Sequence, residues 1–129
     1  MVNFTRKPRY DYADLLEIIR LLRSPEGCPW DKAQTHASIR RGLLEESYEA
    51  AEAIDLDDAA LLQEELGDVL SAAVKVGRFA EVDPETAIAS TCEKFIHRFR
   101  AVESGAQGRP LETLTPEEMT ELWNRAKRF

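Results

Sequence analysis

The 129-residue sequence lacks the features that mark several large classes of protein. It contains two histidines and two cysteines, Cys28 and Cys92, and it has no Cys-x-x-Cys pattern. This scarcity argues against a disulfide framework or a structural zinc site, and it favours a reducing, cytoplasmic location. No hydrophobic stretch approaches the roughly 20 residues needed to cross a bilayer, so we expect no membrane segment.

Basic residues are also in deficit. Lys and Arg number 17 against 24 Asp and Glu, which leaves a formal net charge of −7. That balance argues against a protein that coats a nucleic acid polymer or an anionic membrane. Hydrophobic residues make up 43% of the chain, enough for a folded core, and the length predicts a single domain over residues 1–129.

The deficit of positive charge is concentrated in the middle of the chain. Residues 42–74 contain ten acidic residues and no Lys, Arg or His, whereas the flanking segments hold all 17 Lys and Arg. Solvated helix faces usually mix the two signs, because opposite charges four residues apart are favourable and like charges are not. A helical segment with ten uncompensated acids either repels itself or binds a cation.

Hydrophobic residues recur at helical spacing along the whole chain, and no alternating β-branched run predicts a strand. Asp58 (or Asp57) and Asp83-Pro84 are typical helix starts, and Thr115-Pro116-Glu117-Glu118 is a capping box. We therefore predict an all-α bundle of four to five helices over residues 11–127, preceded by an arm over about 1–10. The expected helices cover about 11–23, 37–54, a segment from 58 through Val74, 84–103, and a short last helix from 116.

The second and third predicted helices should form an antiparallel hairpin, since only about four residues join them. Glu46 and Glu49 are three residues apart on one helix, and Glu65 and Asp68 repeat that spacing on the other. Counted from the connection, Glu46 is level with Asp68 and Glu49 with Glu65. Four carboxylates would then converge between two helices.

Such convergence costs several kcal/mol unless a positive charge compensates it. Oxygen-only ligands select a hard cation, so we expect Mg²⁺ at this place, with Mn²⁺ as a substitute. The alternative is that these are ordinary surface acids of a helical hairpin. Two matched pairs without a nearby cation favour the metal site.

The acidic pairs and three other segments resemble the MazG family of all-α nucleoside triphosphate pyrophosphohydrolases. The family signature of Glu-x-x-Glu, a spacer and Glu-x-x-Asp is matched by Glu46, Glu49, Glu65 and Asp68. The resemblance covers about residues 14–127. Its other segments are Gly27-Cys28-Pro29-Trp30-Asp31-Lys32 with Gln34-Thr35-His36, Lys94-Phe95-Ile96-His97-Arg98-Phe99 with Val102-Glu103, and Leu122-Trp123 with Lys127.

The resemblance implies hydrolysis of a (d)NTP to a (d)NMP and pyrophosphate by a metal-activated water. It assigns the four acids to Mg²⁺, and the neighbouring Glu45 or Glu64 is a candidate general base. A homodimer or homotetramer is expected, because short helices bury little surface alone. A narrower relative acting on dUTP, dCTP or phosphoribosyl-ATP, and a catalytically idle module that binds a nucleotide or a protein partner, remain as alternatives.

Several basic and aromatic residues are candidates for binding the nucleotide. Lys94 and Arg98 lie four residues apart, so both reach one side of a helix where they can bind the triphosphate. Trp123 and Lys127 repeat this spacing on the last helix, where the indole either stacks on the nucleotide or packs in the core. The alternative for the two basic residues is ordinary helix-surface charge.

The loop before the second helix contributes Trp30 and Asp31, which can sandwich and hydrogen-bond a base. Equally, Trp30 can plug the end of the bundle and Asp31 can cap a turn. Lys75 stands seven residues after Asp68, where relatives often carry Asn or an aromatic residue, and Cys92 stands where some carry Asn. Lys75 can replace the charge of a second metal, contact phosphate, or alter substrate choice.

Overall fold

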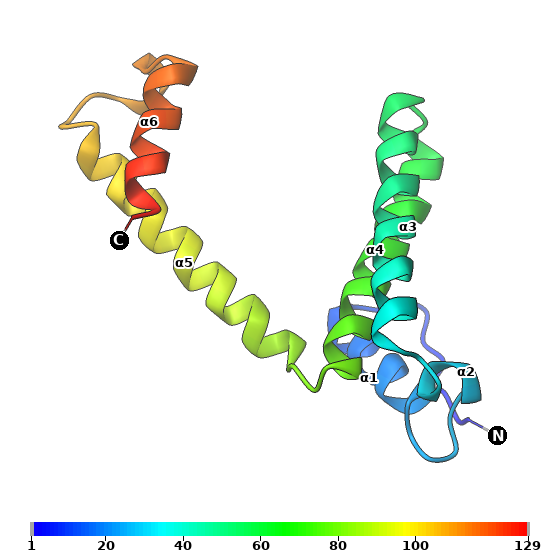
Figure 1. Ribbon diagram of the computed structural model, residues 1–129. Coiled ribbons are helices and arrows are strands. Elements are labelled where there is room, and N and C mark those ends of the chain that lie inside the picture. Colours follow the sequence, from blue (N-terminus) through cyan, green and yellow to red (C-terminus); the bar gives the residue numbers. More distant parts are fainter. Residues whose placement is uncertain (1, 129) are drawn as a thin grey trace. The chain divides into compact units, whose positions relative to one another are not determined.

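The structure is a computed structural model, and it describes residues 2–128 as helices joined by short connections (Figure 1). No strand occurs in this range, which confirms the predicted all-α class. None of its helices is long and apolar enough to span a membrane. The elements in order are α1 (Tyr12–Leu22), α2 (Pro29–Lys32), α3 (His36–Asp55), α4 (Ala59–Phe79), α5 (Pro84–Gly105), the 3-10 turn η1 (Leu111–Thr113) and α6 (Pro116–Ala126).

The chain divides into two compact units, with the boundary between Pro84 and Glu85 in the first turn of α5. The first unit contains α1 to α4, and the second contains α5, η1 and α6. The single domain predicted over residues 1–129 stays a prediction, and each unit is described here by itself.

The first unit is built on the antiparallel hairpin of α3 and α4, which run side by side (Figure 1). Asp57 adopts a left-handed conformation (φ 52°) between the helices, and the side chain of Asp58 accepts a hydrogen bond from the Leu61 amide at 3.0 Å. This side-chain cap satisfies an amide that the first turn of α4 leaves unpaired. The predicted hairpin and its connection are confirmed.

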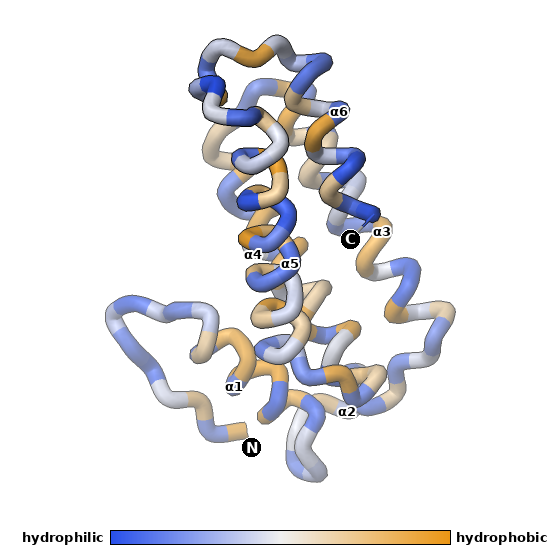
Figure 2. Tube along the Cα trace, turned by 90° about the vertical axis from the view of Figure 1, so that its left-hand side faces the viewer, coloured by the Kyte–Doolittle hydropathy of each residue, from blue (hydrophilic) through white to orange (hydrophobic). Residues whose placement is uncertain are grey.

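Helix α1 packs against α4 through a small buried core of Leu16, Ile19 and Val74. Burying such side chains contributes about 1.5–3 kcal/mol each. Asp11 starts α1 with a capping box, and the preceding arm is held by an ion pair between Lys7 and Asp14. Elsewhere along the helices hydrophobic residues alternate with hydrophilic ones at short intervals (Figure 2).

In the second unit α6 lies alongside α5 (Figure 1), with Val102 and Ala126 among the residues buried in it. A Cβ atom at Gly105 would come within 2.7 Å of Leu122 Cδ2, so glycine permits the close approach at the end of α5. The Thr115 hydroxyl accepts from the Glu118 amide at 3.1 Å, and the Glu118 carboxylate accepts from the Thr115 amide at 3.0 Å. The capping box predicted from sequence is confirmed atom by atom.

Two short elements depart from the predicted loops. Trp30 and Asp31 lie in the single turn of α2, because Pro29 at its first position fixes φ near its helical value. The helix predicted over 84–103 extends two residues further, to Gly105, and the connection between it and the last helix contains η1.

Candidate metal and nucleotide site

Three glutamates of the hairpin converge between α3 and α4. Glu46, Glu49 and Glu65 each place one carboxylate oxygen so that all three oxygens lie within 4.8 Å of one another. Helical spacing puts Glu46 and Glu49 on one face of α3, and the antiparallel hairpin brings Glu65 of α4 beside them. No ion pair joins these acids to any residue in the range 2–128.

Two oxygens of this cluster are buried without a hydrogen-bond partner, namely Oε2 of Glu46 and Oε2 of Glu65. Burial raises the pKa of both carboxyl groups, and the neighbouring carboxylates of Glu49 and Asp68 raise it further. Carboxylates that lose water without gaining a donor or a cation are unfavourable. A bound cation would therefore stabilise this cluster of carboxylates.

The donor set fits a hard divalent cation. Carboxylate oxygens are the ligands of Mg²⁺ and Mn²⁺, and no softer nitrogen or sulfur donor joins the group that converges here. A cation at this place would compensate the charge of the converging carboxylates and so reduce the repulsion that raises the two pKa values. The assignment of these acids as metal ligands stays a prediction that this geometry supports.

The fourth predicted ligand lies next to this group but outside it. Asp68 lines a cavity together with Glu46, and its negative charge raises the pKa of Glu46 and of Glu65. Its oxygens do not belong to the group of three glutamate oxygens that lie within 4.8 Å of one another. The candidate bases Glu45 and Glu64 are exposed beside the cluster, and their charges raise the pKa of Glu46 and Glu65 respectively.

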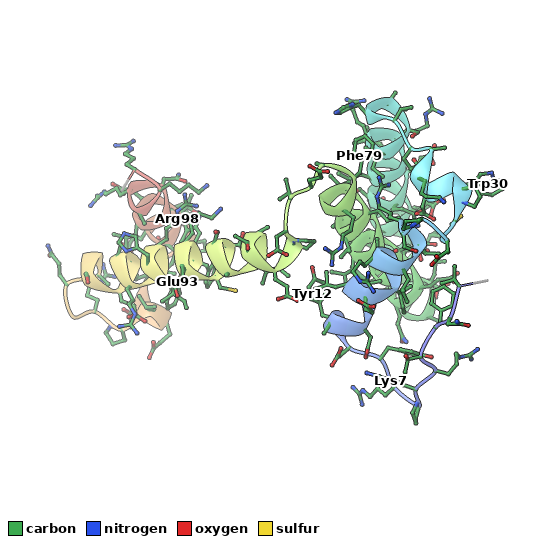
Figure 3. All side chains as sticks on the ribbon, turned by 90° about the horizontal axis from the view of Figure 1, so that it is seen from below. Lys7, Tyr12, Trp30, Phe79, Glu93 and Arg98 are labelled. Atoms are coloured by element: carbon green, nitrogen blue, oxygen red, sulfur yellow. The ribbon has the colours of Figure 1, made fainter. Side chains whose placement is uncertain are left out.

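Lys94 and Arg98 lie on α5 in the second unit, where Figure 3 labels Arg98. Lys94 is exposed, whereas Arg98 is half-buried and its Nε donor is buried without a partner. A buried donor of a guanidinium group is satisfied by an anionic oxygen of a phosphate or carboxylate. This supports Arg98 as a ligand for an anion.

The aromatic candidate of α6 packs against α5. The rings of Trp123 and Phe95 lie 5.5 Å apart between centroids, and Trp123 is half-buried. Trp123 therefore has the packing role that the sequence left open, and its stacking on a nucleotide stays a prediction. Lys127 is exposed as the C-cap of α6.

The candidates of α2 and α4 line one cavity of about 300 Å³ in the first unit, beside Glu46 and Asp68. Trp30 is 83% exposed and projects from the edge of the first unit (Figure 3), so it does not plug a bundle end within that unit. Asp31 and Lys75 are both half-buried in the cavity wall. The structure thus brings Trp30, Asp31 and Lys75 together with two of the predicted metal ligands.

Comparison with known proteins identifies the family of this chain. Residues 34–102 match the MazG nucleotide pyrophosphohydrolase domain. The chain belongs to the MazG family. This confirms the resemblance drawn from the four motifs, and the matched range includes all four predicted ligands, Lys75, Lys94 and Arg98.

Two curated MazG relatives illustrate the similarity. The nucleoside triphosphate pyrophosphohydrolase/pyrophosphatase MazG of Thermotoga maritima is 52% identical over 59 residues, which are 46% of this chain and 23% of the relative. The nucleoside triphosphate pyrophosphohydrolase of Escherichia coli K12 is 48% identical over 68 residues, 52% of this chain and 26% of the relative. The aligned region spans about a quarter of the length of each.

A solved structure supports the fold over nearly the whole chain. The MazG-related protein from Thermotoga maritima superimposes with a TM-score of 0.67 at 33% sequence identity, covering 91% of this chain and 99% of that one. The helical architecture of the present chain is therefore that of the MazG family.

Sequence reasoning missed part of the cavity in this MazG-family chain. Ser38, Gly42 and Ser71 line it together with the predicted residues. The signal was present in the spacing, since Gly42 precedes Glu46 by one helical turn and Ser71 lies between Asp68 and Lys75 on one face of α4. Ser and Gly carry no charge, so a pattern of charges and motifs does not single them out.

Proposed function

We propose that this chain hydrolyses nucleoside triphosphates between the α- and β-phosphates, releasing a nucleoside monophosphate and pyrophosphate, in a reaction that depends on Mg²⁺. The observation that carries the proposal is the convergence of three glutamates with two buried, unpaired oxygens on a MazG-family hairpin. The relatives from Thermotoga maritima and Escherichia coli, which are named nucleoside triphosphate pyrophosphohydrolases, support the same reaction.

In this mechanism Glu46, Glu49, Glu65 and Asp68 would hold the ion, and Mn²⁺ would substitute for it. When bound, the ion supplies positive charge that stabilises phosphate oxygens and makes water more acidic. Glu45 or Glu64 accepts the proton of the attacking water as general base. The water oxygen bonds to phosphorus while the bond to the bridging oxygen breaks, and pyrophosphate leaves.

The triphosphate requires cations that the acidic hairpin does not provide. Lys94 and Arg98 would bind its oxygens, with Arg98 contributing the buried Nε that has no partner among the described residues. Lys127 would add a further positive charge, and Trp123 would hold α6 against α5 by its contact with Phe95. A cytoplasmic location is part of the proposal, supported by the scarcity of cysteine in the sequence, which has no Cys-x-x-Cys pattern.

The identity of the products tests the reaction. The purified chain would be incubated with the eight common NTPs and dNTPs in ¹⁸O-labelled water with Mg²⁺, and the products resolved by chromatography and mass spectrometry. We expect monophosphate and pyrophosphate with one labelled oxygen between them. Diphosphate with orthophosphate would place the cleavage at another bond, and a complete lack of turnover would favour the idle binding module.

We also infer that the chain works as a homodimer or homotetramer. The hairpin leaves large apolar side chains exposed at i,i+4 spacing on both helices, including Tyr48 at 73% and Leu70 at 54%. Leu44 and Leu66 stand one turn before them and are also exposed. Apolar surface of this extent on a small acidic protein is typical of an interface.

Sedimentation or light scattering in solution tests the association. Leu70→Glu should shift the chain towards monomer, because a charge at an apolar interface is costly to desolvate. Val82→Glu is the matched control, since Val82 is equally exposed but lies in the connection between α4 and α5. A wild-type chain that sediments as a monomer at micromolar concentration would contradict the inference.

A further inference from the structure

The cavity of about 300 Å³ beside the carboxylate cluster has a composition that indicates which part of a substrate it receives. Its lining residues all fall between Cys28 and Lys75, so it lies wholly within the first unit. Glu46 and Asp68 stand at one part of its wall, and Lys75 follows Asp68 by two helical turns, about 10 Å along α4. The cavity therefore extends from the predicted metal site along the hairpin.

Most of the cavity wall is apolar or neutral. Ile39, Leu43 and Ala72 contribute aliphatic surface, and Trp30 stands at the rim. A Cβ atom at Gly42 would meet no other atom within 4 Å, so this glycine leaves space open beside the cluster. The volume lies at the lower end of the range for small-molecule sites.

Apart from the predicted metal ligands, the lining contains one basic and one acidic side chain, Lys75 and Asp31. Lys75 is half-buried, and its ammonium group makes no ion pair or hydrogen bond to any residue that the structure describes. The main-chain oxygen of Asp31 accepts a hydrogen bond from Arg23 Nη1 at 2.5 Å. The carboxylate of Asp31 accepts no hydrogen bond from any of residues 2–128. Lys75 can only donate and Asp31 can only accept.

A polyphosphate tail fits this wall poorly. Its negative charges would lie beside the carboxylate of Asp31 with a single lysine to compensate them. A flat heterocycle that presents a carbonyl oxygen next to an N–H group would satisfy Lys75 and Asp31 together. Guanine, hypoxanthine, uracil and thymine carry such a lactam edge, whereas adenine and cytosine present an amino group where the others have the carbonyl.

We propose that this cavity receives the base of the substrate, and that Lys75 and Asp31 select bases with a lactam edge over adenine and cytosine. Lys75 donates to the base carbonyl, and Asp31 accepts from the adjacent N–H. The inference rests on the proposed function, which places the phosphates of the nucleotide at the predicted metal site and so directs the base into the cavity. Lys75 acts as a specificity residue and takes no part in the bond-breaking step.

The ratio of kcat/KM values for dGTP and dATP, with dUTP and dCTP as a second pair, tests the selection. The wild-type chain should favour dGTP and dUTP about tenfold, which corresponds to one hydrogen bond from a charged donor. Lys75→Met should bring both ratios within about threefold of unity. Lys7→Met removes the same charge from an exposed ion pair outside the cavity and should preserve the ratios.

The outcomes separate the base selection from the reaction itself. Equal or reversed base preference in the wild-type chain would overturn the selection while leaving hydrolysis intact, and that measurement needs no variant. A uniform loss for all four nucleotides in Lys75→Met would assign the lysine to phosphate instead.

Equilibrium binding of the α,β-methylene analogues of GTP and ATP provides a readout independent of turnover. A preference for the guanine analogue that is lost in Lys75→Met would support the proposed base selection. If such a chain hydrolysed no nucleotide, the proposed hydrolysis would be wrong and the base selection would still stand. Equal binding of both analogues would overturn the selection.

Discussion

Acidic residues of this chain behave in two opposite ways, depending on the region in which they lie. On α1, Glu17 pairs with Arg20 at 2.6 Å, and this contact lowers the pKa of Glu17. On α6, the hydrogen bond from the Thr115 amide and the ion pair with Arg109 at 3.3 Å lower the pKa of Glu118. In the α3–α4 hairpin, burial and mutual repulsion raise the pKa of Glu46 and Glu65. The same side chain is thus stabilised as an anion at the helix surfaces and destabilised as one in the hairpin.

The difference follows from where the chain places its cations. On α1 and α6, Arg20 and Arg125 follow an acid by three or four residues, and Arg109 reaches Glu118 from the loop before α6, whereas residues 42–74 contain no basic residue. Exposed ion pairs contribute at most about 1 kcal/mol, so the paired acids on α1 and α6 are minor surface features. The unpaired acids of the hairpin mark the part of the chain that requires a ligand from outside.

The largest expected effect comes from removing one acid of the hairpin. Glu49→Gln should lower kcat/KM for any hydrolysed nucleotide about 10³-fold, because the charge stabilisation that an ion supplies is worth several kcal/mol. Steady-state assays at saturating Mg²⁺ would measure this.

The matched control for this substitution is Glu121→Gln, which removes an acid paired with Arg125 at 2.6 Å on α6. It should change kcat/KM by less than about twofold, since exposed pairs contribute little. Equal losses in the two variants would erase the distinction between the two regions.

Addition of Mg²⁺ should stabilise the folded chain through the hairpin. An ion at a hundred times its Kd adds about 2.7 kcal/mol, which corresponds to a rise in Tm of about 10 °C for a chain of this size. Calorimetry or a dye-based melt with Mg²⁺ and with EDTA would measure the shift. Glu49→Gln should lose most of it and Glu121→Gln should retain it, and a wild-type Tm indifferent to Mg²⁺ would count against the metal site.

A smaller effect on stability is expected at the capping box, where Glu118 already has hydrogen-bond partners. Thr115→Ala removes the hydroxyl that accepts from the Glu118 amide, and N-cap losses of this kind cost about 1 kcal/mol. Thermal unfolding should show the loss, while Mg²⁺-dependent stabilisation should persist undiminished. A reduced response to Mg²⁺ in this variant would show that the two regions are not independent.

The smallest expected effect is on stability as a function of pH without metal. The folded chain binds protons at Glu46 and Glu65 more tightly than the unfolded chain, since their pKa lies above the ordinary 4.5. Their contribution to stability is present at low pH and is lost as the pH rises through the raised pKa. Acids with lowered pKa, such as Glu17, contribute in the opposite sense and lose their contribution as the pH falls.

In EDTA, the Tm of the wild-type chain minus the Tm of the Glu46→Gln/Glu65→Gln variant should therefore increase as the pH is lowered from 7 to 5. Circular dichroism melts over this interval would measure the difference. A constant difference between the two chains would show that the pKa values of the hairpin acids are not raised.

Much of this architecture could be predicted from local patterns. The Thr115 capping box, the start of α5 at Pro84 and the short link between α3 and α4 depend on residues within a few positions of one another, so their spacing specifies them. The short helix α2 was predicted as a loop, because one turn of helix carries no periodicity to read.

Spacing along the chain was enough to predict that two helices carry matched acids without a local cation, and the MazG motifs were enough to predict the family. Which of these acids come together depends on packing. Three of the four place oxygens within 4.8 Å of one another, and Asp68 stands just outside, because contact across a hairpin depends on side-chain direction as well as level. Tertiary packing likewise set Lys75 and Asp31 in one cavity wall, since residues 44 positions apart meet only when α2 folds against the hairpin.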